Sequence, residues 1–260
     1  MAAAFPRLNR LLSRFPPETL AALTSHSEDV ILQRGEVLYG QGERIESFCF
    51  PAAGVVSQYQ VSAGGRRIEV AMIGREGMTG MALLLGVDRS PEEACVVVGG
   101  EAVRVDASAL LEVSRSYPAV RDLLLRYVQA SAVQKANTAL SHGLDTLERR
   151  LGRWLLMSHD RMQGDDLPLT HDQLSTALGV RRSGVTSALH VLEGERLVRA
   201  VRGKVTVLDR EGLKTLVGDS YGAPEAEYER LLGEEAVAVV EQPPCRSHRA
   251  RTDALESAGH

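Results

Sequence analysis

The chain has 260 residues, of which 44% are hydrophobic, 25% charged and only 4% aromatic. These fractions are ordinary for a globular protein and exclude collagen-like, purely coiled-coil and wholly disordered chains. The 30 lysines and arginines nearly balance the 34 aspartates and glutamates, so the net charge of −4 indicates no particular partner. Charge is therefore informative only where it is locally concentrated.

Neither a secretory signal nor a membrane span is expected. Arg7, Arg10 and Arg14 interrupt the first 15 residues, so the continuous apolar run of a signal peptide is missing. Residues 47–65 carry no charge but contain proline, glycines and glutamines, which makes them too polar to cross a bilayer. Apolar residues at helical spacing predict a short amphipathic helix near the N-terminus: Leu8, Leu11, Leu12 and Phe15.

The cysteines and histidines indicate no metal or disulfide framework. Cys49, Cys95 and Cys245 are odd in number and have no C-x-x-C spacing, which fits a reducing compartment. The seven histidines show neither H-x-H nor H-E-x-x-H spacing, so no metal site is expected. We therefore expect a cytoplasmic protein.

Short β-branched segments separated by glycine-containing turns fill the first 110 residues. This regular spacing of short strands and turns predicts a compact antiparallel barrel or jelly roll over residues 1–115. Ala63–Gly65 is the expected hairpin connection between two of the strands. The candidate strands are residues 30–32, 37–39, 48–50, 55–61, 68–73, 95–98 and 102–105.

Residues 116–142 predict one long helix, because they contain no glycine and Pro118 stands near the start, where a helix tolerates it. Six residues there are spaced alternately three and four positions apart, as in the seam of a heptad repeat: Val120, Leu123, Tyr127, Ala130, Gln134 and Asn137. We expect this seam to pair two copies of the chain. The alternative is that the stripe packs on its own domain. Gln134 and Asn137 then either fix register or face a small ligand.

Residues 143–220 predict a winged helix-turn-helix. Thr170–Gln173 forms a capping box at the start of a helix that runs to Leu178, and Gly179 permits the sharp turn into a second helix. Two short strands joined at Arg202–Gly203 follow as the wing. Tail residues 221–260 are rich in proline and acidic groups, and disorder is expected from about 235 onward.

The outer face of the second helix is suited to DNA. Residues 178–205 hold six lysines and arginines against two glutamates, a local cationic patch of the kind that binds phosphate. The alternative interpretation of any one of these charged residues, taken singly, is that it is an ordinary solvent-exposed surface residue. The expected base contacts are Arg182, Ser183, Thr186 and Ser187, and the expected backbone contacts are Thr170, Arg181, Arg202 and Lys204.

Over about residues 15–217 the chain resembles the Crp/Fnr family of bacterial transcription regulators. The resemblance rests on Gly35–Glu36, Gln41–Glu43, Phe50–Gly54, Arg153–Met157, Leu178–Arg182 and Leu208–Leu213. It implies an α+β chain with a cyclic-nucleotide-binding-like β-roll, a long dimerisation helix and a C-terminal winged helix-turn-helix. It also implies a homodimer that binds double-stranded DNA, with RNA polymerase as the expected protein partner.

Two departures from the family pattern limit what the resemblance implies. Ser183 and Ser187 stand where family recognition helices often carry Glu and Arg, so the operator sequence cannot be transferred. Met81 replaces the ribose-binding Glu, and Glu92 lies near the phosphate-binding Arg position, so we expect the cyclic AMP pocket to be lost. Arg89 restores a phosphate site only if the loop register shifts. The candidate effector pocket comprises Gly80, Met81, Ala82, Arg89 and Ser90.

The sequence thus predicts a homodimeric, sequence-specific DNA-binding regulator on a palindromic operator, with no enzymatic activity. Cyclic nucleotide, haem and iron–sulfur cofactors are not expected, because their binding residues are not apparent and no cysteine precedes Cys49. The competing hypothesis is a ligand sensor or protein-interaction module that has lost specific DNA binding. The charge of the second helix, which is lower than in the family pattern, motivates that alternative.

Overall fold

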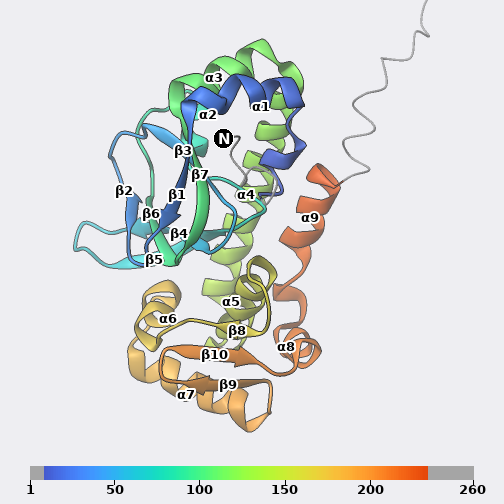
Figure 1. Ribbon diagram of the computed structural model, residues 1–260. Helices are drawn as coiled ribbons and strands as arrows, with labels where there is room; N and C mark the ends of the chain where they lie inside the picture. Colours follow the sequence, from blue (N-terminus) through green and yellow to red (C-terminus); the bar gives the residue numbers. More distant parts are fainter. Residues whose placement is uncertain (1–8, 234–260) are drawn as a thin grey trace, which may run out of the picture.

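The strands of the N-terminal part form two antiparallel sheets that enclose one core (Figure 1). This computed structural model describes residues 9–233. The sheet orders are β1-β7-β3 and β2-β6-β4-β5. The strands are β1 (Ser27–Leu32), β2 (Val37–Tyr39), β3 (Ser47–Pro51), β4 (Val55–Val61), β5 (Arg67–Ile73), β6 (Glu93–Val98) and β7 (Gly100–Asp106). The predicted β-roll is confirmed.

The N-terminal segment packs on this core without forming the predicted α-helix. Leu11, Leu12 and Phe15 are buried, and the Phe15 ring meets Phe50 edge-on at 6.4 Å. Only Leu12–Arg14 form a single 3₁₀ turn, because Phe15 is extended before Pro16, the residue that precedes α1 (Pro17–Leu23). Leu8 lies outside the described residues. The other short helices of this part are α2 (Met81–Leu84) and α3 (Ala107–Ser116).

A long helix, α4 (Pro118–Leu144), links the β-roll to the C-terminal part. Its 27 residues give a rod of about 40 Å. A proline in the first turn costs no hydrogen bond, and Tyr117 before it is extended. None of the described helices combines the length and apolar composition needed to span a membrane.

The C-terminal part is a winged helix-turn-helix. Its buried side chains, among them Trp154, Leu174, Val185 and Leu213, form a second core that also includes Met72 and Val97 of the β-roll. Its three short strands are ordered β8-β10-β9. The elements are α5 (Leu147–Arg161), β8 (Asp166–Leu167), α6 (His171–Leu178), α7 (Arg182–Gly194), β9 (Val198–Val201), β10 (Lys204–Val207) and α8 (Arg210–Val217).

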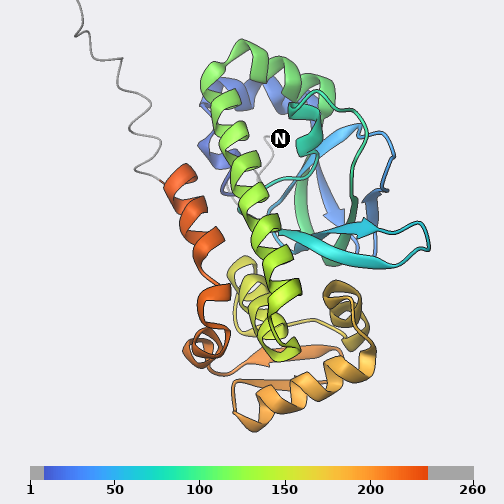
Figure 2. The ribbon, with the colours of Figure 1, turned by 180° about the vertical axis from the view of Figure 1, so that it is seen from behind.

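A final helix, α9 (Ala223–Leu232), lies along α4 and returns toward the β-roll (Figures 1 and 2). Leu232 is fully buried in the β-roll core, and the Tyr228 hydroxyl donates to the Glu76 carbonyl at 2.7 Å. The prediction that the tail starts at 221 is therefore wrong for this segment. The disorder expected from about 235 falls outside the described residues.

The predicted dimer seam on α4 faces the chain's own domains. Val120, Leu123, Tyr127 and Ala130 are at most 6% exposed. Gln134 Oε1 accepts a hydrogen bond from the Met72 amide at 2.7 Å. The remaining seam residue, half-buried Asn137, bonds the carbonyl one turn back, that of Val133. The predicted seam is therefore wrong and the packing alternative is correct, because α4 carries several apolar stripes whose spacing alone does not distinguish them.

A different face of α4 is left uncovered between α9 and the β-roll (Figure 2). We call it the open α4 face. Leu140 is 57% and Leu144 79% exposed. The exposed residues of this face recur every three or four positions from Gln129 to Gly143, with Leu144 one turn after Leu140: Gln129, Ala132, Ala136, Leu140, Gly143 and Leu144.

Candidate nucleic-acid interface

The helix-turn-helix begins with the predicted capping box. Thr170 Oγ1 accepts from the Gln173 amide at 3.3 Å, and Gln173 Oε1 accepts from the Thr170 amide at 3.0 Å. These bonds satisfy amides that the first turn of α6 leaves free. At the other end, Gly179 has a φ of +65°, a left-handed conformation that glycine adopts without strain. The turn sets α7 against α6.

The inner face of α7 is fully packed. Val185, Ala188, Leu189 and Leu192 are all at most 1% exposed. A β-carbon on Gly184 would lie 3.2 Å from Leu147 Cδ2, so the glycine lets α7 approach α5 closely. The helix-weakening glycine inside α7 therefore has a packing role.

The outer face of α7 points into solvent. Arg181, Arg182, Ser183 and Ser187 are exposed, whereas Thr186 is half-buried and its hydroxyl lies 3.0 Å from His171 Nδ1. Three of the four expected base-contacting side chains are thus exposed along one helix face, although the Ser187 hydroxyl donates to the Ser183 carbonyl at 3.1 Å. Thr186 would have to exchange its histidine partner for a base.

Arg182, the principal candidate for base contact, has a nearby acid. Its Nε lies 3.5 Å from Asp172 Oδ1, and both side chains are largely exposed. Surface ion pairs of this kind contribute at most about 1 kcal/mol. The guanidinium can therefore leave Asp172 for a guanine edge or a phosphate at little cost.

The wing is a tight hairpin whose turn presents a cation that pairs with no acid among residues 9–233. Arg202 is exposed beside Gly203, which has a φ of +78°. Lys204 instead pairs with Asp166 at 2.8 Å, so a phosphate contact by Lys204 requires that pair to open. Glu193 accepts from the Ala200 amide at 2.8 Å, which ties the wing to α7. Helix α7, which is the recognition helix of the helix-turn-helix, and the wing flank a groove of about 460 Å³.

Thr170, expected on the DNA backbone, is held toward the β-roll. Arg34 of the β-roll donates from Nη2 to Thr170 Oγ1 at 3.3 Å and also to Gln173 Oε1. Gln173 Nε2 donates to the Val97 carbonyl at 2.7 Å. The start of α6 is thus a contact between the two domains, and Thr170 reaches a phosphate only if Arg34 releases it.

A second candidate site, the β-roll cavity, lies between the β-roll and α4. It encloses about 190 Å³, and Met81, Ala82 and Ser90 line it. Two other residues expected in this pocket, Arg89 and Gly80, do not line it. Arg89 is exposed and donates to the Gly42 carbonyl at 2.9 Å, while the Gly80 amide donates to the Tyr39 hydroxyl at 3.0 Å. The register shift that would bring Arg89 inward is therefore not present.

An internal ion pair fills the polar end of the β-roll cavity. Glu92 lines it and pairs with Lys135 of α4, while Glu93 pairs with Arg67 instead. Gln58 Oε1 is buried there and has no hydrogen-bond partner in the part of the chain that the structure describes. Lys135 was missed by sequence reasoning, because it lies 43 residues from its partner and no local pattern connects the two.

The fold and the interface together define a DNA-binding transcription regulator with an N-terminal β-roll. Residues 30–117 match the model of the cyclic nucleotide-binding domain, and residues 149–216 match that of the Crp-like helix-turn-helix domain. These two matches cover more than half of the chain in the expected order. The chain belongs to the Crp/Fnr family, as its sequence motifs indicate.

Experimental structures show the same fold at low sequence identity. FixK2 from Bradyrhizobium japonicum is 19% identical with a TM-score of 0.63, and the match covers 73% of this chain and 96% of that one. The c-di-GMP-responsive global regulator CLP from Xanthomonas campestris is 16% identical with a TM-score of 0.60, covering 74% and 99%. No curated protein sequence matches the chain.

Proposed function

We propose that the protein is a homodimeric transcription regulator that binds a palindromic DNA operator. The observation that carries this proposal is the exposed outer face of α7, where Arg182, Ser183 and Ser187 project from a packed helix-turn-helix. Arg reads guanine bidentately, and serine reaches bases or phosphates. The exposed Arg202 of the wing would contact the flanking phosphates. RNA polymerase is the proposed protein partner, and regulation rather than catalysis is the proposed activity.

The open α4 face is the proposed dimer interface. Its small residues, such as Ala132 and Ala136, permit close approach of a second helix, and Leu140 and Leu144 expose apolar surface that such a helix would bury. Leu85, 62% exposed, and Ala132 both line the β-roll cavity beside α4. The interface would thus extend from α4 onto the β-roll.

A two-fold axis along paired α4 helices would give both recognition helices the same relation to DNA. The half-sites would then lie about 34 Å apart, one turn of the double helix. The operator would be an inverted repeat for the same reason.

DNA binding is proposed to be independent of cyclic AMP. A cyclic phosphate entering the β-roll cavity would meet the Glu92 carboxylate, and Lys135 is already paired with it. Placing an anion beside this acid would cost several kcal/mol unless the pair is broken. Calorimetry with cyclic AMP tests this point. No binding is expected at millimolar nucleotide, and micromolar affinity would contradict it.

Competition binding tests the DNA proposal itself. DNA fragments selected by the purified protein from a random pool would be retained in an excess of random competitor, with an affinity that falls as salt rises. Equal competition by random DNA would instead favour a sensor that no longer recognises specific DNA. An Arg182→Ala variant separates the two outcomes, because it should lose the preference and keep the salt-dependent background.

A further inference from the structure

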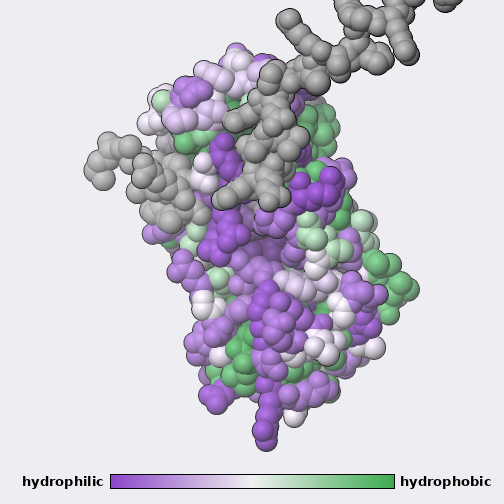
Figure 3. All heavy atoms as spheres, turned by 90° about the vertical axis from the view of Figure 1, so that its right-hand side faces the viewer, coloured by the Kyte–Doolittle hydropathy of each residue, from purple (hydrophilic) through white to green (hydrophobic). Residues whose placement is uncertain are grey.

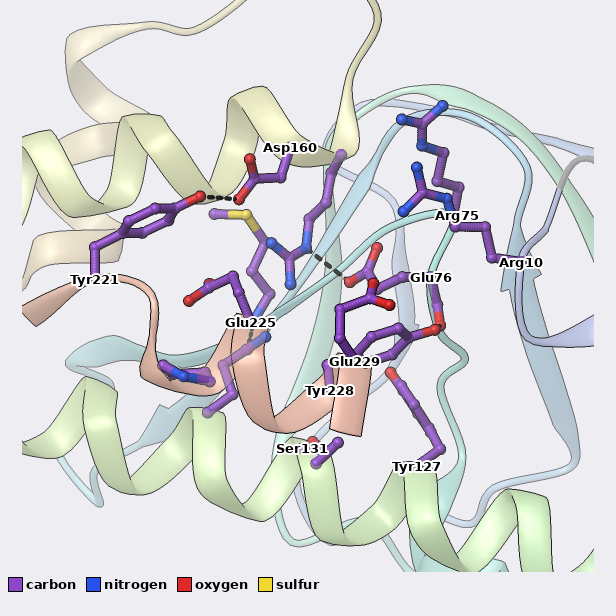
Figure 4. Close-up of a pocket in the computed structure, with 15 residues that line it drawn as sticks. Arg10, Arg75, Glu76, Tyr127, Ser131, Asp160, Tyr221, Glu225, Tyr228 and Glu229 are labelled. Carbon is purple, nitrogen blue, oxygen red and sulfur yellow. Dashed lines mark hydrogen bonds and ion pairs between the residues drawn. The ribbon is translucent and has the colours of Figure 1, made fainter. Parts of the chain in front are cut away.

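A second cavity of about 300 Å³, here called the junction cavity, lies where several parts of the chain meet. Its walls come from α4, the C-terminal end of α5, helix α9, the end of β5 with the residues that follow it, and Arg10 of the N-terminal segment (Figure 4). The volume is in the range of small-molecule sites. Figure 3 views the molecule from the α9 side, and hydrophilic residues dominate the middle of that face. Ser131 of α4 lines both this cavity and the β-roll cavity.

Part of the charge in the junction cavity is neutralised internally. Arg161, only 7% exposed, pairs through Nε with Glu76 at 2.8 Å. Asp160 pairs with Arg210 at 2.6 Å and accepts from the Tyr221 hydroxyl at 2.7 Å. These pairs build a fixed polar wall, and they account for four of the charged groups at this junction.

The other charged groups of the lining have no ion-pair partner among residues 9–233. They are two cations, Arg10 and Arg75, and two acids, Glu225 and Glu229. Arg75 Nε is buried without a hydrogen-bond partner in the described structure. Glu225 uses one oxygen to accept from the Gly222 amide at 3.0 Å, which leaves its other oxygen available.

Three of these four charged groups lie on two opposite sides of the cavity. In Figure 4 the Arg10 and Arg75 side chains lie together at one side of the cavity, and Glu225 lies at the opposite side. Less polar surface from Met72, Ala130 and Pro224 also lines the cavity. Arg75 and Glu225 are half-buried, whereas Arg10 and Glu229 are exposed. An anion alone would leave Glu225 without an ion-pair partner, and a cation alone would leave Arg75 without one.

We propose that the junction cavity binds a small organic zwitterion. Its anionic group would bind Arg75 and Arg10, its cationic group would bind Glu225, and its apolar middle would contact Met72. This site differs from the β-roll cavity, which lies on another side of α4 and contains its own Glu92–Lys135 pair.

Occupancy of the junction cavity would influence DNA binding, a step that rests on the proposed function. Met72 and Arg75 belong to the β-roll, whereas Glu225 belongs to α9, which follows the winged domain in the chain. A ligand held between them would favour one arrangement of the β-roll and the C-terminal part, and differential affinity of this kind is what couples two sites.

Calorimetry of the full chain with 6-aminohexanoate tests the site without DNA. This probe carries a carboxylate and an ammonium group at opposite ends, and hexanoate and hexylamine each keep only one of them. We expect 6-aminohexanoate to bind at least tenfold more tightly than either analogue. Absence of binding at 10 mM, or equal binding of a singly charged analogue, would overturn the proposal.

Two variants locate the probe. Arg75→Gln and Glu225→Gln should each weaken binding at least tenfold, and glutamine at 225 retains the oxygen that accepts from Gly222. Arg66→Gln changes an exposed arginine of the β4–β5 hairpin and should leave affinity unchanged. Unaltered affinity in both cavity variants would overturn the proposal. Binding of the probe with no change in DNA affinity would contradict only the coupling.

Discussion

The indole Nε1 of Trp154 donates a hydrogen bond to Glu69 Oε1 at 2.9 Å, across the boundary between the winged domain and the β-roll. Ser57 donates to the other carboxylate oxygen. Glu69 is 3% exposed, and this burial raises its pKa from 4.5 to about 7. The hydrogen bonds from Ser57 and Trp154, and the positive charges of Arg153 and Arg161, oppose that rise.

Glu69 should make stability depend on pH. Because its pKa is higher in the folded chain, the folded state holds the proton more tightly than the unfolded state. The free energy of unfolding should therefore fall as pH rises from about 4.5 to about 7, by on the order of 3 kcal/mol. Glu69→Gln should remove this slope in urea unfolding, and Glu18→Gln, at an exposed position, should retain it. The same slope in all three proteins would refute the assignment.

Gly77 should tolerate no larger side chain. A β-carbon there would lie 2.0 Å from the Tyr127 hydroxyl oxygen, which is held by its bond to the Met78 carbonyl at 3.3 Å. Gly77→Ala should lower the free energy of unfolding by about 1–3 kcal/mol. Gly64→Ala is the control, because nothing lies within 4 Å of a β-carbon at that position. Equal stability of the two variants would show that Tyr127 moves aside freely.

Arg182 and Arg202 should contribute differently to DNA binding. Arg182→Ala should cost about 1–3 kcal/mol on the operator and relax the sequence preference, because base contacts are lost. Arg202→Ala should weaken operator and random DNA alike and reduce the dependence on salt, because only a phosphate contact is lost. Titrations of both DNAs at several salt concentrations measure these effects. Identical losses for the two variants on both DNAs would contradict this division of roles.

Leu140→Glu should dissociate the proposed dimer. It places a charge on the open α4 face without disturbing the monomer, since Leu140 is 57% exposed. Light scattering after gel filtration should show a dimer for the unmodified chain and a monomer for this variant. Leu208→Glu changes another exposed leucine, 53% exposed, and should remain dimeric. An unmodified chain that is monomeric, or a Leu140→Glu dimer, would exclude this interface.

Local patterns were sufficient to predict most of the fold. The strand at 55–61 and the Thr170–Gln173 capping box depend on neighbouring residues, and both are present. The orientation of α4 depends instead on which of its stripes meets the β-roll, and the heptad beginning at Val120 does not contain that information. Helix α9 is stabilised by distant contacts such as that of Tyr228 with Glu76. These contacts join residues that are far apart in the sequence, so the composition of α9 alone predicted a tail rather than a packed helix.

The candidate sites follow the same division. The exposed residues of α7 could be read from helical spacing, because a short helix packed on one side has only one outer face. The Glu92–Lys135 pair and the junction cavity bring together residues that are far apart in the sequence. Neither could be found without the tertiary structure.

Selection of DNA from a random pool by the unmodified protein tests the central claim most directly. Sequencing of the retained fragments should show an inverted repeat whose half-site centres lie about 10 base pairs apart, and Arg182→Ala should fail to enrich it. Retention of fragments that share no repeat, equally by both proteins, would contradict the account.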